Sequence, residues 1–479
     1  MSDDVRAVGK SQMPASRRSD GRPRPMFWIV VAFLALVTFT GGSSRVDVPA
    51  LLVLRPVSML ACAFAFLTLR PDHLAGRRWL FGGFAAIVAL ILLHLLPLPP
   101  GLWQALPGRG EIATVDALSG LAGQWRPLTL TPVNALHGLV SLAVPLAVLL
   151  LASQLERTDL FRLLPLVIAI GAASGLVGLL QAIGSRGGLL DPYGTAADGG
   201  AGGLFANRNH AALLLAILFP MLAAWIRTGS GDPARQGLRL WGALAMAAVL
   251  CPLILVTGSR SGLLLALFGL AGAGLILVRG GIGGSIPRAR RRALSIAAIA
   301  IGGLLVLGFA TFYFARAEAI ERLFAKSTIY DPRLDNWSVS RVLLMKYLPF
   351  GSGASSFVEA YQIIEPGAQI SPTYRNHAHN DVLEIGITLG VAGLALVMAG
   401  LLAYLRCTVP LWIGPRADGR GTTMARVASI ALAMMAMASL TDYPLRTPIM
   451  MSVFALCCLW LIEPLRARAE TDAIGTTVR

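Results

Sequence analysis

The sequence predicts an all-α membrane protein, a polytopic helical bundle with about twelve transmembrane helices. Of its 479 residues, 55% are hydrophobic and 14% are charged, and the mean hydropathy is +0.68. Soluble domains carry about 25% charged residues. The apolar residues form runs of roughly 20, the length that crosses a bilayer as a helix. Lys and Arg occur in short groups between these runs, as topology signals do.

The apolar runs are interpreted as transmembrane helices in chain order. They lie near 26–42, 49–69, 78–97, 134–153, 160–183, 209–226, 238–257, 260–278, 294–314, 382–404, 425–443 and 447–463.

Four further segments complete the predicted organisation around transmembrane helices 1–9 (26–314) and 10–12 (382–463). Residues 1–25 are polar and basic and predict a disordered cytoplasmic tail before a retained anchor. Residues 315–381 form one long loop, in which SVSRVLLMKYL predicts a short interfacial helix. Residues 464–479 predict a second cytoplasmic tail.

The distribution of basic residues predicts the orientation. With a cytoplasmic N-terminus, 26 of the 41 Lys and Arg residues lie in cytoplasmic segments, 14 lie outside, 7 of them in the loop 315–381, and Arg55 lies within a span. Both termini are therefore expected in the cytoplasm. The formal net charge of +16 is explained by these topology signals and by anionic lipid, because the chain carries no nucleic-acid-binding module. The five Cys form no CxxC pair, so neither disulfides nor a thiolate metal site is expected.

Two arginines stand out because the short outer loops contain few basic residues. Arg208 lies in GLFANRNHAALLLAILFP and Arg260 in LVTGSRSGLLLALFGL, each at the outer start of an apolar helix. A helix N-terminus favours anions, and the guanidinium fork binds two phosphate oxygens. The pair predicts a diphosphate site at the outer membrane border. Alternatively, each arginine snorkels to the interface and anchors its helix.

A third outer helix start carries the stretch RNHAHND, directly before the helix from about 382. All three starts offer residues that cap helices. These residues are Asn207 and Asn209, Ser259 and Ser261, and Asn380 and Asp381. Whether the three helix ends meet in space is left open by the sequence.

The HAHND cluster allows three interpretations. As part of a metal site, His377 and His379 would need further ligands, and only His210 is expected on the same side. As an acid/base site, one imidazole would take a proton from a sugar hydroxyl, and Asp381 or Glu384 would orient it. As a plain membrane border, His379 and Asp381 would be solvated residues that cap the helix. Trp337 in the long loop is interpreted as a sugar-stacking residue or an interfacial anchor.

These motifs, in this order, resemble the O-antigen ligase and polymerase superfamily. The order is GLFANRNHAA, TGSRSGLL, PRLDNW with PFGSGASSF, and RNHAHNDVLEIGITLGVAGL. The superfamily includes lipopolysaccharide O-antigen ligases, Wzy-type polysaccharide polymerases and protein O-oligosaccharyltransferases. The resemblance is strongest from about 200 to 400. The HNxxL segment before a Gly-rich helix is its most specific part.

The resemblance implies an inverting, metal-independent glycosyltransferase of the GT-C type, without a cofactor. Its donor would be a glycan on undecaprenyl diphosphate, and its acceptor a growing polysaccharide or lipid A core. The site would face the periplasm at the bacterial inner membrane, and a chain-length regulator protein is a candidate partner. The lack of a long soluble C-terminal extension disfavours the protein-glycosylating branch.

Carried over by position, Arg208 and Arg260 match the diphosphate-contacting arginines of that superfamily, and His379 matches its essential histidine. Arg333 matches an arginine that precedes the loop Trp. His377 ranks below His379, and Asn380 belongs to the same HNxxL segment.

Two other classes of function remain as alternatives. A lipid-linked glycan transporter would need charged residues in mid-span to line a path, whereas here they gather at outer helix ends. A metal-dependent membrane hydrolase would be inhibited by a chelator. Between polymerase and ligase, the sequence favours polymerase slightly.

Overall fold

The protein is described by a computed structural model over residues 23–183, 190–191, 193–194, 201–229, 232–279, 332–367, 370, 374–414 and 419–477. Side chains at 233, 332–336 and 467–477 are outside the description. Within these residues the chain is almost entirely helical, so the predicted all-α membrane fold is confirmed.

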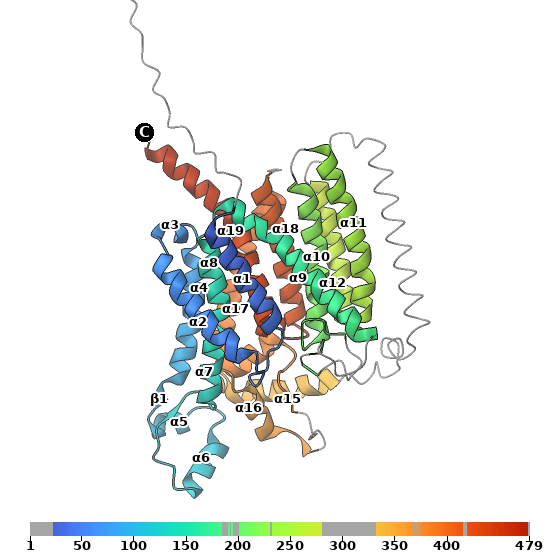
Figure 1. Ribbon diagram of the computed structural model, residues 1–479. Helices are drawn as coiled ribbons and strands as arrows, with labels where there is room; N and C mark the ends of the chain where they lie inside the picture. Colours follow the sequence, from blue (N-terminus) through green and yellow to red (C-terminus); the bar gives the residue numbers. More distant parts are fainter. Residues whose placement is uncertain are drawn as a thin grey trace, which may run out of the picture.

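The helices and strands follow one another along the chain as follows (Figure 1). They are α1 (Pro25–Thr40), α2 (Leu51–Thr68), α3 (Pro71–Leu74), α4 (Arg78–Leu95), β1 (Pro97–Leu98), α5 (Pro100–Gln104), α6 (Gly110–Leu118), β2 (Arg126–Pro127), α7 (Pro132–Ser141), α8 (Ala143–Ser153), α9 (Arg157–Ile183), α10 (Arg208–Arg227), α11 (Pro233–Val256), α12 (Arg260–Arg279), α15 (Pro332–Tyr347), α16 (Phe357–Ile364), α17 (Asp381–Ile413), α18 (Arg420–Ser439), η4 (Pro444–Arg446) and α19 (Pro448–Thr477).

Ten helical segments in the described part of the chain are long and apolar enough to cross a membrane, with α7 and α8 counted as one. The α1 helix is apolar but shorter, at 16 residues. Eleven of the predicted runs therefore coincide with helices. The twelfth, near 294–314, lies outside the described residues, as does most of the predicted N-terminal tail. The α19 helix continues to Thr477, past the predicted end of the last span.

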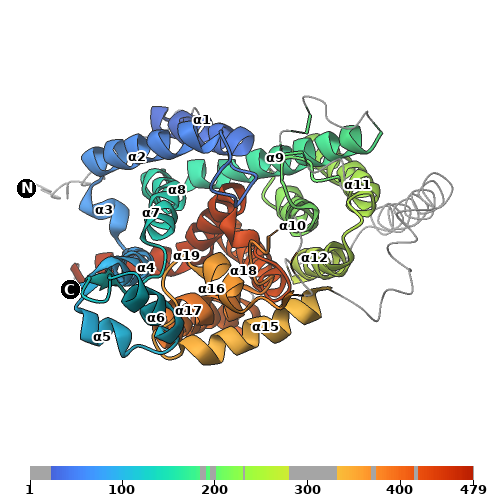
Figure 2. The same cartoon turned by 90° about the horizontal axis from the view of Figure 1, so that it is seen from below.

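Helices α10, α18 and α19 form the interior of the bundle. Most of their apolar side chains are buried, whereas α2 and α4 expose theirs. Figure 2 shows α18 and α19 in the middle, with α1 and α2 along one edge and α15 along the opposite edge. Exposed apolar faces on the outer helices are expected in a protein whose solvent there is lipid.

Small residues let α10 and α12 pack closely. A Cβ atom at Gly262 would lie 2.3 Å from the Cβ of Ala212, and one at Gly269 would lie 2.5 Å from the carbonyl oxygen of Ala216. Close approach at small residues is a common way in which membrane helices associate. It brings the first turns of the two helices, with Arg208 and Arg260, side by side.

The glycine-rich PFGSGASSF segment fastens the long loop to α17. At Gly390 the α17 backbone leaves helical geometry, with φ of 62°. Pro349 O accepts from Val391 N at 2.9 Å, and Ser352 N donates to Ile387 O at 2.8 Å. A Cβ at Gly390 would lie 2.1 Å from Pro349 O, so only glycine fits. The segment therefore has a structural role, since it holds the long loop against α17.

One end of the bundle carries the additional short elements. Figure 1 shows α5, α6 and β1 there, near α15 and α16, at the end opposite to the C-terminus. All but the last residue of SVSRVLLMKYL lie in α15, so the stretch is helical, as expected; its place at a membrane interface stays a prediction. The buried Arg109 connects these elements, because its Nη2 donates to Leu128 O at 2.7 Å and to Gly351 O at 3.3 Å.

Candidate functional site

The HAHND stretch is an irregular segment held from two sides. Trp337 Nε1 donates to Ala378 O at 3.1 Å, and Ala378 N donates to Glu384 Oε2 at 2.8 Å. His379 has φ of 53°, a conformation uncommon outside glycine that turns the chain just before α17. Asn380 caps the helix by accepting from Leu383 N at 3.0 Å, as predicted from the sequence.

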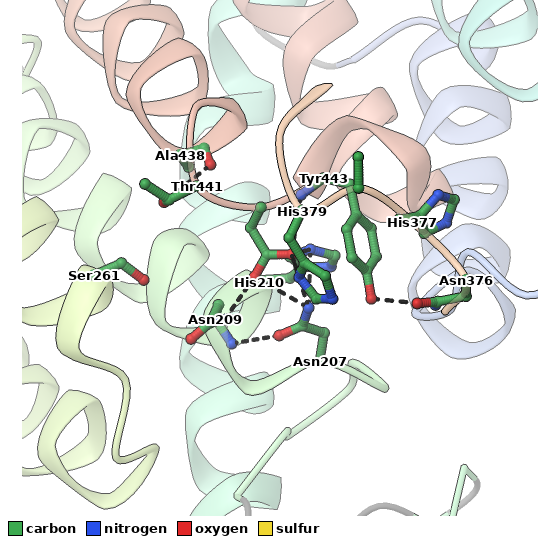
Figure 3. A network of polar contacts seen from close by, with 12 residues as sticks. Asn207, Asn209, His210, Ser261, Asn376, His377, His379, Ala438, Thr441 and Tyr443 are labelled. Atoms are coloured by element: carbon green, nitrogen blue, oxygen red, sulfur yellow. Dashed lines mark hydrogen bonds and ion pairs between the residues drawn. The ribbon is translucent and has the colours of Figure 1, made fainter. Parts of the chain in front are cut away.

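A buried carboxylate lies at the centre of the site. Asp442, in the turn between α18 and α19, is 2% exposed. Its Oδ1 lies 3.3 Å from His379 Nδ1 and 3.7 Å from His210 Nε2. Asn209 Nδ2 donates to Oδ2 at 2.6 Å, and Asn207 Nδ2 lies 3.3 Å from both oxygens. Figure 3 shows these asparagine and histidine side chains converging from α10 and the HAHND segment.

The surroundings of Asp442 favour its ionised form. Burial raises the pKa of this carboxyl, but hydrogen bonding and charge attraction from His210 and His379 outweigh burial and hold the pKa well below its usual range. The neighbouring phenol behaves oppositely. Burial, with the charge of Asp442, raises the pKa of Tyr443 to about 12. At neutral pH the turn therefore presents a carboxylate beside a neutral phenol.

Tyr443 is surrounded by imidazole rings. The ring centroids lie 4.1 Å from His377, 5.0 Å from His379 and 5.1 Å from His210. Asn376 Nδ2 donates to the phenol oxygen at 3.3 Å (Figure 3). The phenol ring thus forms a common wall against which the three histidines pack.

The carboxylates at the start of α17 have a different partner from the expected one. Asp381 or Glu384 was expected to orient one imidazole of the cluster; Glu384 contacts His377, whereas the carboxylate beside His379 is Asp442. Arg446 Nε lies 2.9 Å from Asp381 Oδ1, Arg446 Nη1 lies 3.0 Å from Glu384 Oε1, and His377 Nδ1 lies 3.1 Å from Glu384 Oε1.

The physical reason is the backbone at His379. Asp381 and Glu384 share one face of α17, which meets η4 and its Arg446. The positive φ turns the His379 side chain away from that face and toward Asp442.

The starts of α10 and α12 are joined by a hydrogen bond. Asn207 Oδ1 accepts from Asn209 N at 2.8 Å, which caps α10. Ser259 Oγ accepts from Gly262 N at 3.0 Å in the first turn of α12 and donates to Asn209 Oδ1 at 2.7 Å. The predicted capping by Asn207, Ser259 and Asn380 is therefore confirmed.

Both predicted phosphate-binding arginines are next to the residues of this Ser259–Asn209 hydrogen bond. Arg208 directly precedes Asn209, and Arg260 directly follows Ser259. Arg208 Nη1 lies beside the loop before α12, 3.8 Å from the position that a Cβ would take on Gly258. Arg260 is exposed. The chain of contacts from Ser259 through Asn209 to Asp442 and His379 shows that the three helix starts converge.

Two further predictions concern Arg333 and metal binding. Arg333 lies in the first turn of α15, and its side chain is outside the described residues. Among the residues that the structure describes, no group of three His, Cys, Asp or Glu side chains has an arrangement that could hold a metal ion. His210 and His379 do meet, but at a carboxylate that is already bonded to two asparagines.

Sequence reasoning missed the turn 439–447, which supplies Asp442, Tyr443 and Arg446. A signal was present, because SLTDYPLRT places an acid inside the end of the predicted span 425–443 and an arginine directly before the next apolar run. Charged residues at such a position are costly and therefore indicate a specific partner.

One comparison with known proteins found a matching family model. The family model described as O-antigen ligase matches residues 245–398, from the second half of α11 into α17. The matched segment contains Arg260, Arg333 and the HAHND stretch, whereas Arg208 and Asp442 lie outside it. No curated protein matches the chain.

Proposed function

We propose, from the premise that residues 245–398 belong to the O-antigen ligase family, that this membrane protein transfers a glycan from undecaprenyl diphosphate to a sugar hydroxyl. The observation that carries the proposal is the contact of His379 with the buried, ionised Asp442, beside the joined starts of α10 and α12.

In the proposed reaction, His379 is the general base. Its side chain is 27% exposed, against 14% for His377 and 1% for His210, so His379 is the most accessible of the three histidines around Tyr443. Because its Nδ1 faces the Asp442 carboxylate, Nε2 is the nitrogen that accepts a proton from the acceptor hydroxyl. A carboxylate in this position orients the imidazole and stabilises the imidazolium that forms.

Arg208 and Arg260 bind the diphosphate in this proposal. The acceptor oxygen forms a bond to the anomeric carbon, and the bond from that carbon to the diphosphate oxygen breaks. The electron pair leaves with the diphosphate, whose growing charge is stabilised by the arginines and by free N–H groups at the helix starts. Attack from the side opposite to the leaving group inverts the anomeric configuration. The cleaved linkage supplies the energy, so this mechanism uses neither metal nor nucleotide.

The proposed location is the bacterial inner membrane, with the site facing the periplasm and both termini in the cytoplasm. The charge distribution supports this orientation. Of the two family activities, we favour a polymerase acting on a growing polysaccharide over a ligase acting on lipid A core. A chain-length regulator protein is a candidate partner of the polymerase.

The proposal is tested by reconstituting the full chain in liposomes with labelled undecaprenyl-diphosphate glycan. The label is expected to move to a longer lipid-linked glycan or to lipid A core, and to do so equally in the presence of EDTA. Movement of intact donor across the bilayer without a new glycosidic bond would indicate a transporter. Loss of product in EDTA, with release of free glycan in its absence, would indicate a metal-dependent hydrolase.

A further inference from the structure

A pocket beside the catalytic cluster has no role in the mechanism above. Its volume is about 260 Å³, and four polar residues of the α1–α2 connection line it, namely Ser43, Ser44, Arg45 and Asp47. Asn207, His210, Asn376 and Tyr443 close its inner side, and Tyr193 also lines it. Pockets for drug-sized ligands are about 300–1,000 Å³, so this one suits a single small unit.

The connection that forms the outer wall is fixed by bonds to three parts of the protein. Gly42 O accepts from Ala206 N at 3.0 Å, just before α10, and Gly41 O accepts from Ile449 N at 3.1 Å, in α19. Gly42 N donates to the Tyr193 phenol at 3.0 Å. The wall of the pocket is therefore held in place by hydrogen bonds to the rest of the fold.

The charges in the pocket favour a neutral polar ligand. Arg45 Nε lies 2.9 Å from Asp47 Oδ1, so the one arginine is already neutralised by its own loop. Hydroxyl, amide and phenol groups supply the rest of the polar surface. A guanidinium without a carboxylate beside it would instead favour phosphate.

The position of the pocket points to the acceptor. In Figure 3, Ser261 and Asn209 lie on one side of His379, and Asn376 and His377 lie on the other side. The diphosphate is proposed on the first side, and the pocket adjoins Asn376 and Tyr443 on the second. An inverting displacement brings its nucleophile from the side opposite to the leaving group.

We infer that the pocket between the α1–α2 connection and Tyr443 binds one neutral sugar unit of the acceptor glycan. That the bound sugar belongs to the acceptor rests on the proposed function. The binding of a sugar itself can be measured without catalysis. Asp47, Asn207 and Asn376 supply acceptors and donors for sugar hydroxyls, and the Tyr443 ring supplies an apolar face.

The test compares two substitutions in the same connection. Ser44→Trp fills the pocket, whereas Val46→Trp adds the same bulk at a position that is 53% exposed and does not line the pocket. Both full-length variants are purified with wild type and His379→Ala. Saturation-transfer NMR is recorded with methyl glycosides of glucose, galactose, N-acetylglucosamine and rhamnose.

At least one glycoside is expected to bind to wild type, Val46→Trp and His379→Ala, and to lose most of its signal with Ser44→Trp. In the transfer assay, Ser44→Trp is expected to raise the acceptor KM at least about tenfold and to leave the donor KM unchanged. No binding to wild type, or equal binding to Ser44→Trp, overturns the inference, as does an equal rise in both KM values. If the glycosides bind in this pattern but wild-type protein transfers no glycan, the proposed function is contradicted and the sugar-binding site is supported.

Discussion

His379→Ala and Asp442→Asn are each expected to lower kcat for glycan transfer by about 10²–10⁴-fold, the usual contribution of a positioned general base. The two side chains meet at 3.3 Å, and the Asp442 carboxylate is ionised in the fold. An asparagine keeps the size of Asp442 but not the charge that stabilises a protonated imidazole. The measurement is transfer of labelled glycan at saturating donor and acceptor, for protein whose thermal unfolding matches wild type.

The double variant separates a shared role from two independent ones. If Asp442 acts through His379, the double variant is expected to lose about as much activity as His379→Ala alone, because residues acting as a unit are not additive. His73→Ala is the control, since His73 lies in α3 at the other end of the bundle. Full activity in Asp442→Asn, or losses that multiply, would contradict the proposed role of Asp442.

Arg208→Lys and Arg260→Lys are each expected to reduce kcat/KM for the donor by about 10²–10³-fold, as does the loss of one donor group that stabilises charge in a transition state. Lysine keeps the positive charge and the snorkelling stem but lacks the planar fork that holds two oxygens. The measurement is transfer against donor concentration at saturating acceptor.

The same substitutions discriminate between diphosphate binding and membrane anchoring. If either arginine only anchors its helix, its lysine variant keeps wild-type activity. Arg341→Lys provides the control, because Arg341 is an exposed arginine of α15, outside the cluster around Asp442. An equal loss in Arg341→Lys would show that the effect is not specific to the α10 and α12 starts.

Local sequence patterns were sufficient to predict where the helices begin and which residues cap them. Apolar runs predicted the spans, and the residues Asn207, Ser259 and Asn380 lie at the positions where caps were expected. The charge distribution made Arg208 and Arg260 conspicuous before their surroundings were known. Each of these features depends on residues within a few positions of one another, which is the range over which sequence patterns are informative.

The partner of His379 could not be found in this way. Asp442 is bonded to Asn207 and Asn209, which lie more than 230 positions earlier in the chain. Sequence proximity favoured Asp381 and Glu384 instead, whereas His379, with its positive φ, has its imidazole beside Asp442.

Trp337 illustrates the same limit. The sequence suggested a sugar-stacking residue or an interfacial anchor, and the structure adds that its indole N–H donates to the backbone carbonyl of Ala378, next to His379. The loop that carries Trp337 is in turn fixed to α17 at Gly390, 53 positions later in the chain.

The central claim is a single displacement of the lipid diphosphate by an acceptor hydroxyl, and the anomeric configuration of the product tests it most directly. The measurement uses reconstituted protein, a donor of known configuration at its diphosphate-linked sugar, and NMR of the anomeric proton in the product. The account predicts that the new glycosidic bond has the opposite configuration. Retention of the donor configuration would contradict it, because retention requires two displacements or attack from the side of the leaving group.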